Sequence, residues 1–173
     1  MRGKTGIEPA LVYIGLGSNM GDRGDNLDKA LGLLSQMLGV GKFSSIYDTE
    51  PVGTIGQPRF LNMVCQVYTS LMPQGLLALA KGIEMKLGRA PSKSSPAPRP
   101  IDVDILFYSD QVIEVPGLVI PHSKLVERAF VLIPLAEISP DLRHPVNGKT
   151  IRQLLKEVGG KSGVVRWEGS KER

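Results

Sequence analysis

Apolar and polar side chains alternate along two stretches of the chain, which is the period of a β-strand. Residues 101–108 alternate throughout, and residues 61–69 place every second side chain on one face, namely Leu61, Met63, Cys65, Val67 and Thr69. Two shorter segments, residues 11–16 and 42–47, also have the composition of strands. The pattern therefore predicts four strands before residue 109.

Two other stretches repeat apolar residues at the helical spacing of three and four positions. The first predicted helix has Asp25 as its N-cap and stops at Gly39, and its apolar stripe is Leu27, Ala30, Leu31, Leu34 and Leu38. In the second, Pro73 suits the first turn and Gly88 the end, and the stripe is Leu76, Leu79, Ala80, Ile83 and Leu87. Each stripe predicts a helix with one buried face.

The last third of the chain gives weaker signals. A turn at residues 109–110 is predicted to lead into residues 111–115, although the most favoured hairpin dipeptides are absent. Residues 123–129 predict one or two helical turns. Thr150 and Gln153 fit a capping box at the start of a final helix.

The order β-α-β-β-α-β predicts the ferredoxin-like arrangement of an α+β fold, in which helices pack on one face of an antiparallel sheet and extra elements follow at the C-terminal side. Residues 48–59 and 89–100, rich in proline, glycine or serine, are predicted to be loops. No segment is long enough to divide the chain. We therefore expect one domain over residues 1–173, with flexible ends at residues 1–9 and 168–173.

Composition and charge exclude several classes of protein. The chain is 42% apolar, which argues against disorder, and its single cysteine, Cys65, excludes an intramolecular disulfide. The longest apolar run, residues 129–136, is too short for a membrane span, and no secretory signal is visible, so we expect a cytoplasmic protein with no membrane partner. Residues 149–173 supply the whole net charge of +4, so we expect no nucleic-acid partner.

Asp102 and Asp104 stand two positions apart in the predicted strand 101–108. At this spacing both side chains point to one side, with Cα atoms about 6.5–7 Å apart, and two such carboxylates favour a bound cation. Mg²⁺ prefers oxygen ligands of this kind. Arg89 and Arg99 precede the pair, and guanidinium groups beside metal-binding carboxylates are the combination used in phosphoryl transfer. A solvated strand face is the alternative interpretation.

Other polar residues have both a functional and a structural interpretation. His122 can donate to a phosphate if its segment folds over the aspartate pair, and otherwise it packs or caps. Glu84 follows Lys81 by three positions, the spacing of a surface ion pair on a helix. Asn62 can recognise the edge of a heterocycle or be an edge residue of the sheet. Cys65, among apolar neighbours, is expected in the core.

The glycine-rich sequence at residues 15–19 invites comparison with nucleotide-binding loops. It lacks the third glycine of the dinucleotide fingerprint and the Lys-Ser/Thr pair of a P-loop. It is therefore predicted either to be a tight turn that needs glycine or to contact a nucleotide without either motif.

Six short motifs occur in order between about residue 11 and residue 155. They are Gly17-Ser-Asn19, Tyr47-Asp-Thr-Glu-Pro-Val-Gly53, Phe60-Leu-Asn62, Ile83-Glu84 with Gly88-Arg89, Pro98-Arg-Pro-Ile-Asp-Val-Asp104, and Pro121-His122 through Arg128-Ala-Phe130. This combination closely resembles the 6-hydroxymethyl-7,8-dihydropterin pyrophosphokinase family of folate biosynthesis. The Pro-Arg and Asp-x-Asp block, together with the Pro-His segment, is its most specific part.

The resemblance implies a monomeric, ferredoxin-like enzyme that transfers the terminal two phosphates of ATP as one unit to the pterin hydroxymethyl group and releases AMP. It implies that Asp102 and Asp104 hold two Mg²⁺ ions, and that Arg89 and Arg99 are catalytic with them. The residues that the resemblance places around ATP are Lys81, Glu84, Arg99, Ile105, His122, Ser123 and Arg128.

The resemblance also implies a pterin site between two phenyl rings, the offset stacking that flat heterocycles favour. Phe60 and Phe130 would sandwich the ring, and Asn62 would read its polar edge together with backbone groups nearby. The implied pterin residues are Thr49, Val52, Phe60, Asn62, Asp102 and Phe130.

The chain departs from the family pattern at three places. The implied mobile lid, residues 89–98, lacks the tryptophan and the extra basic residues of better-known members, and Lys93 is the only charge within residues 90–97. Ser123 stands where a tyrosine often follows the histidine. Phe60 replaces a tyrosine found in some members.

Two other classes of protein share parts of this pattern. Nucleotidyltransferases also combine a Gly-Ser turn with an Asp-x-Asp pair, but there the pair follows the turn by roughly a dozen residues, and here it lies far along the chain at Asp102. An RNA-binding ferredoxin-like module would carry clustered aromatic residues on its central strands, whereas aromatic residues make up only 5% of this chain.

Overall fold

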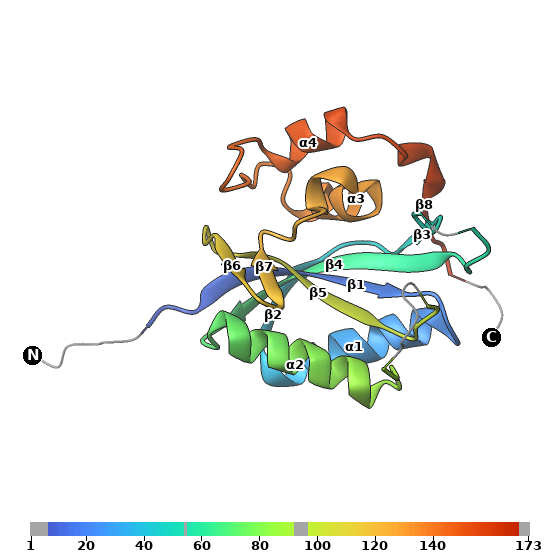
Figure 1. Cartoon of the computed structure of the whole chain (residues 1–173), viewed down its shortest axis with the longest axis horizontal. Helices are drawn as coiled ribbons and strands as arrows, with labels where there is room; N and C mark the ends of the chain where they lie inside the picture. Colours follow the sequence, from blue (N-terminus) through green and yellow to red (C-terminus); the bar gives the residue numbers. More distant parts are fainter. Residues whose placement is uncertain (1–6, 54, 92–96, 170–173) are drawn as a thin grey trace, which may run out of the picture.

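Among residues 7–53, 55–91 and 97–169, which the computed structural model describes, six strands form one antiparallel sheet (Figure 1). Five pair in the order β5-β1-β4-β3-β8, and β2 also pairs with β4. The bounds are β1 Ala10–Ser18, β2 Gly39–Phe43, β3 Tyr47–Thr49, β4 Phe60–Thr69, β5 Asp102–Tyr108 and β8 Val164–Arg166. The arrangement β5-β1-β4-β3 is the ferredoxin-like order, so the predicted fold class is confirmed.

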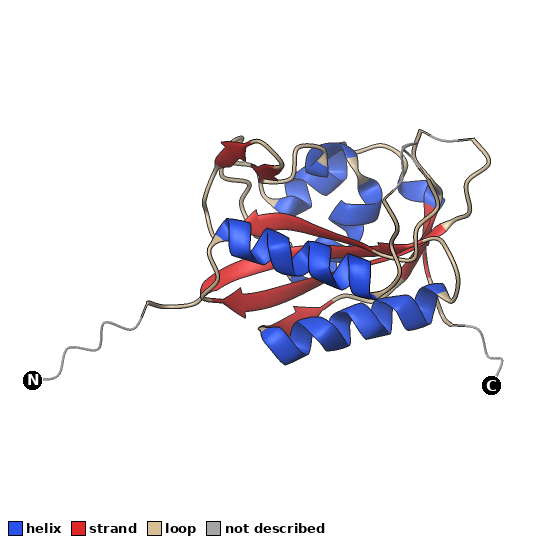
Figure 2. Cartoon of the chain, turned by 60° about the horizontal axis from the view of Figure 1, so that its bottom comes forward, coloured by secondary structure: helices blue, strands red, loops and turns tan. Residues whose placement is uncertain are grey.

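Helices cover both faces of the sheet (Figures 1 and 2). One face packs against α1 (Arg23–Met37) and α2 (Pro73–Lys86), as predicted, and the other is covered by α3 (Ala129–Ile138) and α4 (Ile151–Glu157). A small hairpin of β6 (Ile113–Val115) and β7 (Leu118–Ile120) and two 3₁₀ turns, η1 (Leu125–Glu127) and η2 (Lys161–Gly163), complete the fold.

The α3–α4 layer closes the sheet face on which an RNA-binding module would stack bases. Val64, Leu106 and Phe107 on this face are at most 1% exposed, and they belong to one apolar cluster with Leu125 and Leu132. This face is therefore a core, and the RNA-binding alternative loses its binding surface.

The helix ends follow the predicted capping chemistry with one correction. Asp22, and not Asp25, is the N-cap of α1, because its side chain accepts a hydrogen bond from the Asp25 backbone N–H. Pro73 occupies the first turn of α2, and Gly88 follows that helix with a φ of +94°, a conformation that favours glycine. The capping box at Thr150 and Gln153 is also present.

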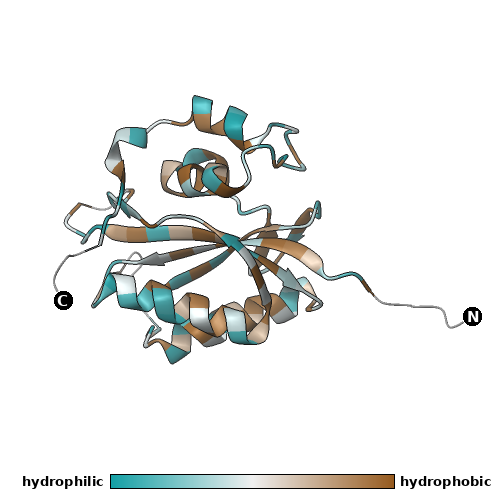
Figure 3. Ribbon diagram, turned by 180° about the vertical axis from the view of Figure 1, so that it is seen from behind, coloured by the Kyte–Doolittle hydropathy of each residue, from teal (hydrophilic) through white to brown (hydrophobic). Residues whose placement is uncertain are grey.

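The alternation predicted for β4 is confirmed, since Leu61, Met63, Cys65 and Val67 belong to the core beside α1 and α2, whereas Val64 belongs to the core beside α3 and α4. The alternation predicted for residues 101–108 fails halfway. Ile14 of β1 pairs with Ile105 and Tyr13 pairs with Phe107, so an extra residue, Leu106, forms a bulge. As a result Phe107 joins the α3 side of the core, and apolar segments line both faces of the sheet (Figure 3).

Two other elements differ from prediction. The strand expected at residues 42–47 is divided into β2 and β3, which both pair with β4, and β2 has an irregular register between Val40 and Phe43. Helix α3 was not predicted as a helix, because it is apolar on nearly all sides and contains Pro134. A helix buried all round carries no amphipathic stripe.

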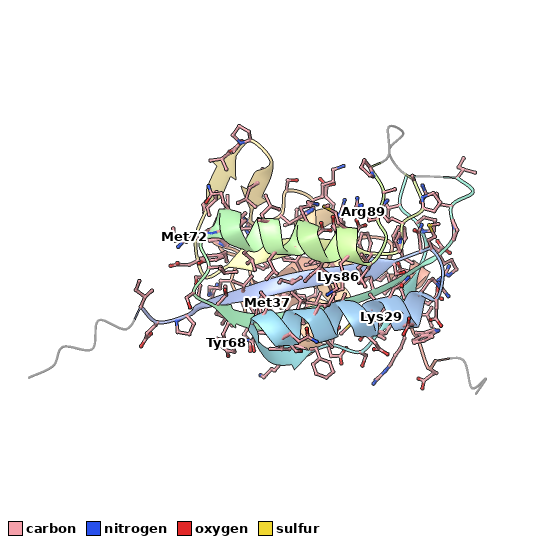
Figure 4. All side chains as sticks on the ribbon, turned by 90° about the horizontal axis from the view of Figure 1, so that it is seen from below. Lys29, Met37, Tyr68, Met72, Lys86 and Arg89 are labelled. Carbon is pink, nitrogen blue, oxygen red and sulfur yellow. The ribbon has the colours of Figure 1, made fainter. Side chains whose placement is uncertain are left out.

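The outer face of the α1–α2 layer is mostly polar, with some exposed apolar residues at one end (Figure 4). Met37, Tyr68 and Met72 are exposed there, while Arg89 follows the opposite end of α2. Within the described ranges, no helix combines the length and the apolar character needed to cross a bilayer.

Candidate active site

A cleft of about 470 Å³ opens between the sheet and the segment that leads into α3. Strands β1, β4 and β5, the loop after β3 and the start of α3 all contribute to its walls. The fold brings ten of the predicted site residues together here: Thr49, Val52, Phe60, Asn62, Arg99, Asp102, Asp104, His122, Arg128 and Phe130.

The floor of the cleft is bare backbone of the central strand β1. Gly15 pairs with Asp104 and Gly17 with Asp102, so the two glycines lie directly opposite the two aspartates. The prediction of a tight turn at residues 15–19 was wrong for these glycines, because β1 continues to Ser18. A side chain at position 17 would displace Asn62, since a Cβ there would lie 2.6 Å from the Asn62 Oδ1 atom.

Asp104 is a carboxyl group in a poorly solvated position. Burial, together with the nearby Asp102 carboxylate, raises its pKa from 3.8 to about 6. Arg128 lowers the pKa but does not offset these effects. Additional positive charge beside Asp104 would therefore favour its ionised form.

Asp102 differs from its neighbour because two arginines already neutralise it. Arg89 donates to Oδ1 and Arg99 donates through Nε to Oδ2. A carboxylate has about four lone-pair positions, so these two ion pairs leave Asp102 able to accept further ligands. The predicted neighbourhood of two carboxylates and two guanidiniums is thus present.

Glu84 connects this cluster to α2. It is 3% exposed, and its Oε1 atom accepts from the Val103 backbone N–H at 2.9 Å and pairs with Arg89 at the same distance. Lys81 pairs with Oε2 at 3.2 Å, so the predicted ion pair exists, but the surface location predicted for Glu84 was wrong. A backbone donor of β5 and the charge of Arg89 make burial of this carboxylate tolerable.

The two phenyl rings of the cleft each carry a guanidinium. The Arg99 guanidinium carbon lies 5.1 Å from the centroid of Phe60, and that of Arg128 lies 5.4 Å from the centroid of Phe130. These are cation–π contacts, in which the positive group rests over the negative face of the ring. Both rings line the cleft, so flat aromatic surface and guanidinium groups adjoin at two places in its wall.

Two of the side chains predicted to recognise a heterocycle, Asn62 and Thr49, are hydrogen-bonded to each other. Asn62 donates through Nδ2 to the Thr49 hydroxyl at 2.7 Å, which fixes the orientation of its amide. Thr49 is itself 1% exposed, and Val52 lies farther out on the cleft wall. The remaining donor and acceptor of Asn62 are available to a ligand.

His122 and Arg128 enter the cleft from the segment before α3. The His122 Nδ1 atom accepts from the Lys124 backbone N–H at 3.3 Å, so the neutral ring carries its proton on Nε2. Burial lowers the pKa of His122, and Arg128 and Lys124 lower it further. The ring is therefore a neutral donor near pH 7. Ser123 is exposed and does not line the cleft.

Sequence reasoning missed several residues that shape the cleft. Asn19 accepts from the Arg99 backbone N–H at 2.8 Å and donates from its own backbone N–H to the Arg99 carbonyl at 3.2 Å. It is 2% exposed and holds Arg99 in place from 80 positions away. Lys124 and Glu127 also line the cleft, adding one charge of each sign. Their only sequence signal was proximity to His122.

Other predicted residues lie behind the cleft or outside the described part of the chain. A chain of ion pairs connects three of them to the cleft: Arg89 pairs with Asp102, Glu84 with Arg89, and Lys81 with Glu84. Ile105 is 5% exposed and lies in the core beside α1 and α2. Their contacts with ATP stay predictions. Residues 92–96 of the predicted lid, and residues 1–6 and 170–173 of the predicted flexible ends, lie outside the described residues.

The donor set of the cleft fits a hard divalent cation. Asp102 and Asp104 supply carboxylate oxygens from one strand, and Mg²⁺ is usually held by one or two carboxylates, with waters and substrate phosphates completing its shell. No cluster of three or more metal-ligating side chains occurs among the residues that the structure describes. Such a site therefore depends on phosphate oxygens as further ligands.

A ferredoxin-like enzyme for phosphoryl transfer is the class that this sheet and this cleft define. Comparison with known proteins agrees, since a family model described as 7,8-dihydro-6-hydroxymethylpterin-pyrophosphokinase matches residues 13–140. The chain belongs to this family, and its reaction is pyrophosphoryl transfer from ATP to the hydroxymethyl group of 6-hydroxymethyl-7,8-dihydropterin in folate biosynthesis.

Two bacterial relatives match the chain along nearly their whole length. The chain is 43% identical over 157 residues to a 2-amino-4-hydroxy-6-hydroxymethyldihydropteridine pyrophosphokinase of Bacillus subtilis, covering 89% of this chain and 93% of that protein. The corresponding protein of Aquifex aeolicus is 41% identical over 148 residues, covering 86% and 92%.

Solved structures share the fold. A chain of Plasmodium falciparum HPPK-DHPS matches with a TM-score of 0.74 at 18% identity, covering 94% of this chain. This chain spans only 47% of that longer one.

Proposed function

We propose that the cleft performs this transfer with two Mg²⁺ ions and that the protein acts as a cytoplasmic monomer. The observation that carries the proposal is the placement of Asp102 and Asp104 on one strand, opposite two glycines and beside Arg99. By contrast, a second cavity, between the end of α1 and residues 68–71, is lined by neither carboxylates nor guanidiniums.

The proposed reaction joins the pterin oxygen to the β-phosphorus of ATP. The hydroxymethyl oxygen attacks that phosphorus, the bond from the β-phosphorus to the oxygen bridging it to the α-phosphate breaks, and AMP leaves with that oxygen. The hydroxyl proton is released. The product is the pterin diphosphate ester. When bound to Asp102 and Asp104, Mg²⁺ would neutralise phosphate charge and favour loss of the hydroxyl proton.

The phosphates are proposed to lie against the cationic wall of the cleft. Arg99 and Arg128 supply guanidinium donors, and the neutral His122 ring supplies its Nε2–H. Arg89 supports Arg99 by sharing the Asp102 carboxylate. In phosphoryl transfer, positioning and charge neutralisation supply most of the catalysis. Ion pairs with Asp102 hold Arg89 and Arg99 in place, and Arg128 rests against the Phe130 ring.

The pterin is proposed to lie between Phe60 and Phe130, with its polar edge toward Asn62 and Thr49 and with Val52 at the rim. Stacking between two rings suits a flat heterocycle. The fixed amide of Asn62 offers a donor and an acceptor, which matches the mixed edge of a pterin. The nucleoside is proposed to lie near Lys81, Glu84, Ile105 and Ser123.

A product assay tests the proposal. The protein is incubated with ATP, Mg²⁺ and the reduced hydroxymethyl pterin, and the nucleotides are separated by chromatography. AMP and a pterin diphosphate are expected in equal amounts, and neither without Mg²⁺. Release of free pyrophosphate with an adenylylated acceptor would show nucleotidyl transfer and overturn the proposal. Light scattering at assay concentrations tests the monomer.

A further inference from the structure

Glu137 joins the C-terminal end of α3 to the chain between β2 and β3. Its carboxylate accepts from the Ser45 backbone N–H at 3.0 and 3.1 Å, from the Ser45 hydroxyl at 2.9 Å and from the Tyr47 hydroxyl at 2.7 Å. One carboxylate thus accepts hydrogen bonds from both Ser45 and Tyr47, and Tyr47 is 90 residues away in the chain. The proposed reaction uses none of these groups.

Both elements that meet at Glu137 carry pterin-site residues at their other ends. On β3, Thr49 lies two positions beyond Tyr47, about 6.6 Å along the strand. The Asn62 amide donates a hydrogen bond to the Thr49 hydroxyl. On α3, Phe130 precedes Glu137 by seven residues, which is close to two helical turns, so both project from the same side of the helix. The Glu137 contact therefore joins two elements that each contribute residues to the proposed pterin site.

The contact is stronger than an ordinary surface hydrogen bond. Burial alone would raise the pKa of Glu137, but the hydrogen bonds from Tyr47 and Ser45 outweigh it and lower the pKa, and Arg166 of the adjacent strand β8 acts in the same direction. Burial and the Glu137 carboxylate raise the pKa of Tyr47 to about 12, so the phenol stays a donor. Bonds to an ionised acceptor are about twice as strong as neutral ones.

We propose that Glu137 is a positioning residue for the pterin half of the active site: it sets the separation between the Phe130 wall on α3 and the Thr49–Asn62 wall on β3 and β4. This inference rests on the proposed placement of the pterin. Of the groups proposed to bind Mg²⁺ and the ATP phosphates, Asp102, Asp104 and Arg99 do not depend on it, because they belong to β5 and the loop before it, whereas Arg128 is the N-cap of α3.

Binding measurements on four full-length variants test this role. Glu137→Ala removes the contact, Glu137→Gln keeps one acceptor oxygen, and Tyr47→Phe removes a single hydroxyl. Glu157→Gln is the matched control, because that exposed carboxylate pairs with Lys149 on α4, remote from β3. Calorimetry gives the Kd of a non-hydrolysable ATP analogue with Mg²⁺, and then the Kd of the pterin in its presence.

The expected result is a selective loss of pterin affinity. Glu137→Ala raises the pterin Kd about tenfold, Glu137→Gln and Tyr47→Phe about threefold, while the Kd of the ATP analogue changes less than about twofold in every variant. In steady state, the KM for pterin rises with a smaller change in kcat. The Glu157→Gln variant behaves as wild type.

Two results would overturn the inference. Equal weakening of both ligands would show a general loss of structure, and unchanged pterin affinity in Tyr47→Phe and Glu137→Gln would show that the contact only adds stability. If Glu137→Ala does not fold, the two milder variants decide. Failure of the wild-type protein to bind pterin or release AMP would instead contradict the proposed function.

Discussion

Arg99 lies over the face of Phe60, the ring proposed to stack on the pterin, and at the same time pairs with Asp102. A guanidinium on this face occupies the position that a flat heterocycle would take. Arg128 has the same relationship to Phe130. The groups proposed to bind phosphate and the rings proposed to bind the pterin are therefore in contact with each other before substrates arrive.

This contact predicts that ATP promotes pterin binding. The phosphates of ATP are stronger partners for guanidinium groups than a ring face is, so ATP with Mg²⁺ is expected to draw Arg99 and Arg128 off the two rings. Titration of pterin by calorimetry, with and without a non-hydrolysable ATP analogue, should give at least about tenfold tighter binding with the analogue. Equal affinities would contradict the prediction.

Replacement of Asp104 by alanine is predicted to abolish turnover with little effect on the fold. The carboxylate contributes to a proposed cation site, and its removal should lower kcat by about a thousandfold or more even at saturating Mg²⁺. Asp102→Ala should have the same effect on kcat. Circular dichroism should stay unchanged for Asp104→Ala. Normal turnover in either variant would refute the metal assignment.

The raised pKa of Asp104 predicts that replacing this residue by a neutral one stabilises the folded protein, and that the gain depends on pH. Because this pKa is raised from 3.8 to about 6, the stability contributed by the protonated group is fully present below 3.8 and is lost as pH rises through about 6. Asp104→Asn keeps the group neutral, so it should be more stable than wild type at pH 8 by about 1–2 kcal/mol, allowing for solvent screening.

Urea unfolding without Mg²⁺ measures this difference. The gain should shrink as the pH falls from 8 toward 4, where Asp104 of the wild type is protonated in the folded state. Asp28→Asn, at an exposed position of α1, is the control and should show no comparable change. A gain that stayed constant with pH would mean that burial of the charge is not its cause.

Gly17 is predicted to control the shape of the pterin site. An alanine methyl group there would lie 2.6 Å from the Asn62 Oδ1 atom, so Asn62 must move, whereas a methyl group at Gly15 meets Leu106 at 3.5 Å, an ordinary contact. Gly17→Ala should weaken pterin binding about tenfold and leave ATP binding nearly unchanged. Gly15→Ala should affect the pterin less, and the reverse order would exclude the steric explanation.

Arg99→Ala is predicted to affect the chemical step more than substrate binding. Its guanidinium is poised beside the carboxylates, and loss of a group that stabilises charge in the transition state should lower kcat about a hundredfold. Single-turnover kinetics separate this step from release of products. Arg152→Ala, which removes an exposed ion pair with Asp141, is the control. A change confined to KM would assign Arg99 to binding alone.

Local periodicity was sufficient to predict much of the sheet and both helices of its first layer. In β4 the alternation from Leu61 to Thr69 is regular, so each residue's face followed from its position. In β5 the same reasoning failed after Ile105, because the bulge at Leu106 reverses the faces of the residues that follow. A bulge depends on the partner strand, which one sequence stretch does not reveal.

The local sequence did not reveal which charged and apolar segments are buried, because their partners lie elsewhere in the chain. Glu84 has the spacing of a surface ion pair with Lys81, but its carboxylate is buried, where it accepts a hydrogen bond from the Val103 N–H and pairs with Arg89. Both partners follow Glu84 in the chain, and Val103 is 19 positions away. The candidate site itself was largely predictable from the motifs, whereas the hold of Asn19 on Arg99 depends on tertiary contact.

The bare backbone of β1 at Gly15 and Gly17 has a consequence for inhibition. A drug that packs against this stretch would touch no side chain that a mutation could shorten, and any residue larger than glycine at position 17 would crowd Asn62 as well as the drug. A substitution at position 17 that prevented the drug from binding would thus also impair binding of the enzyme's own substrate. Compounds anchored on this strand should meet slower evolution of resistance than compounds anchored on the exposed rim near Val52.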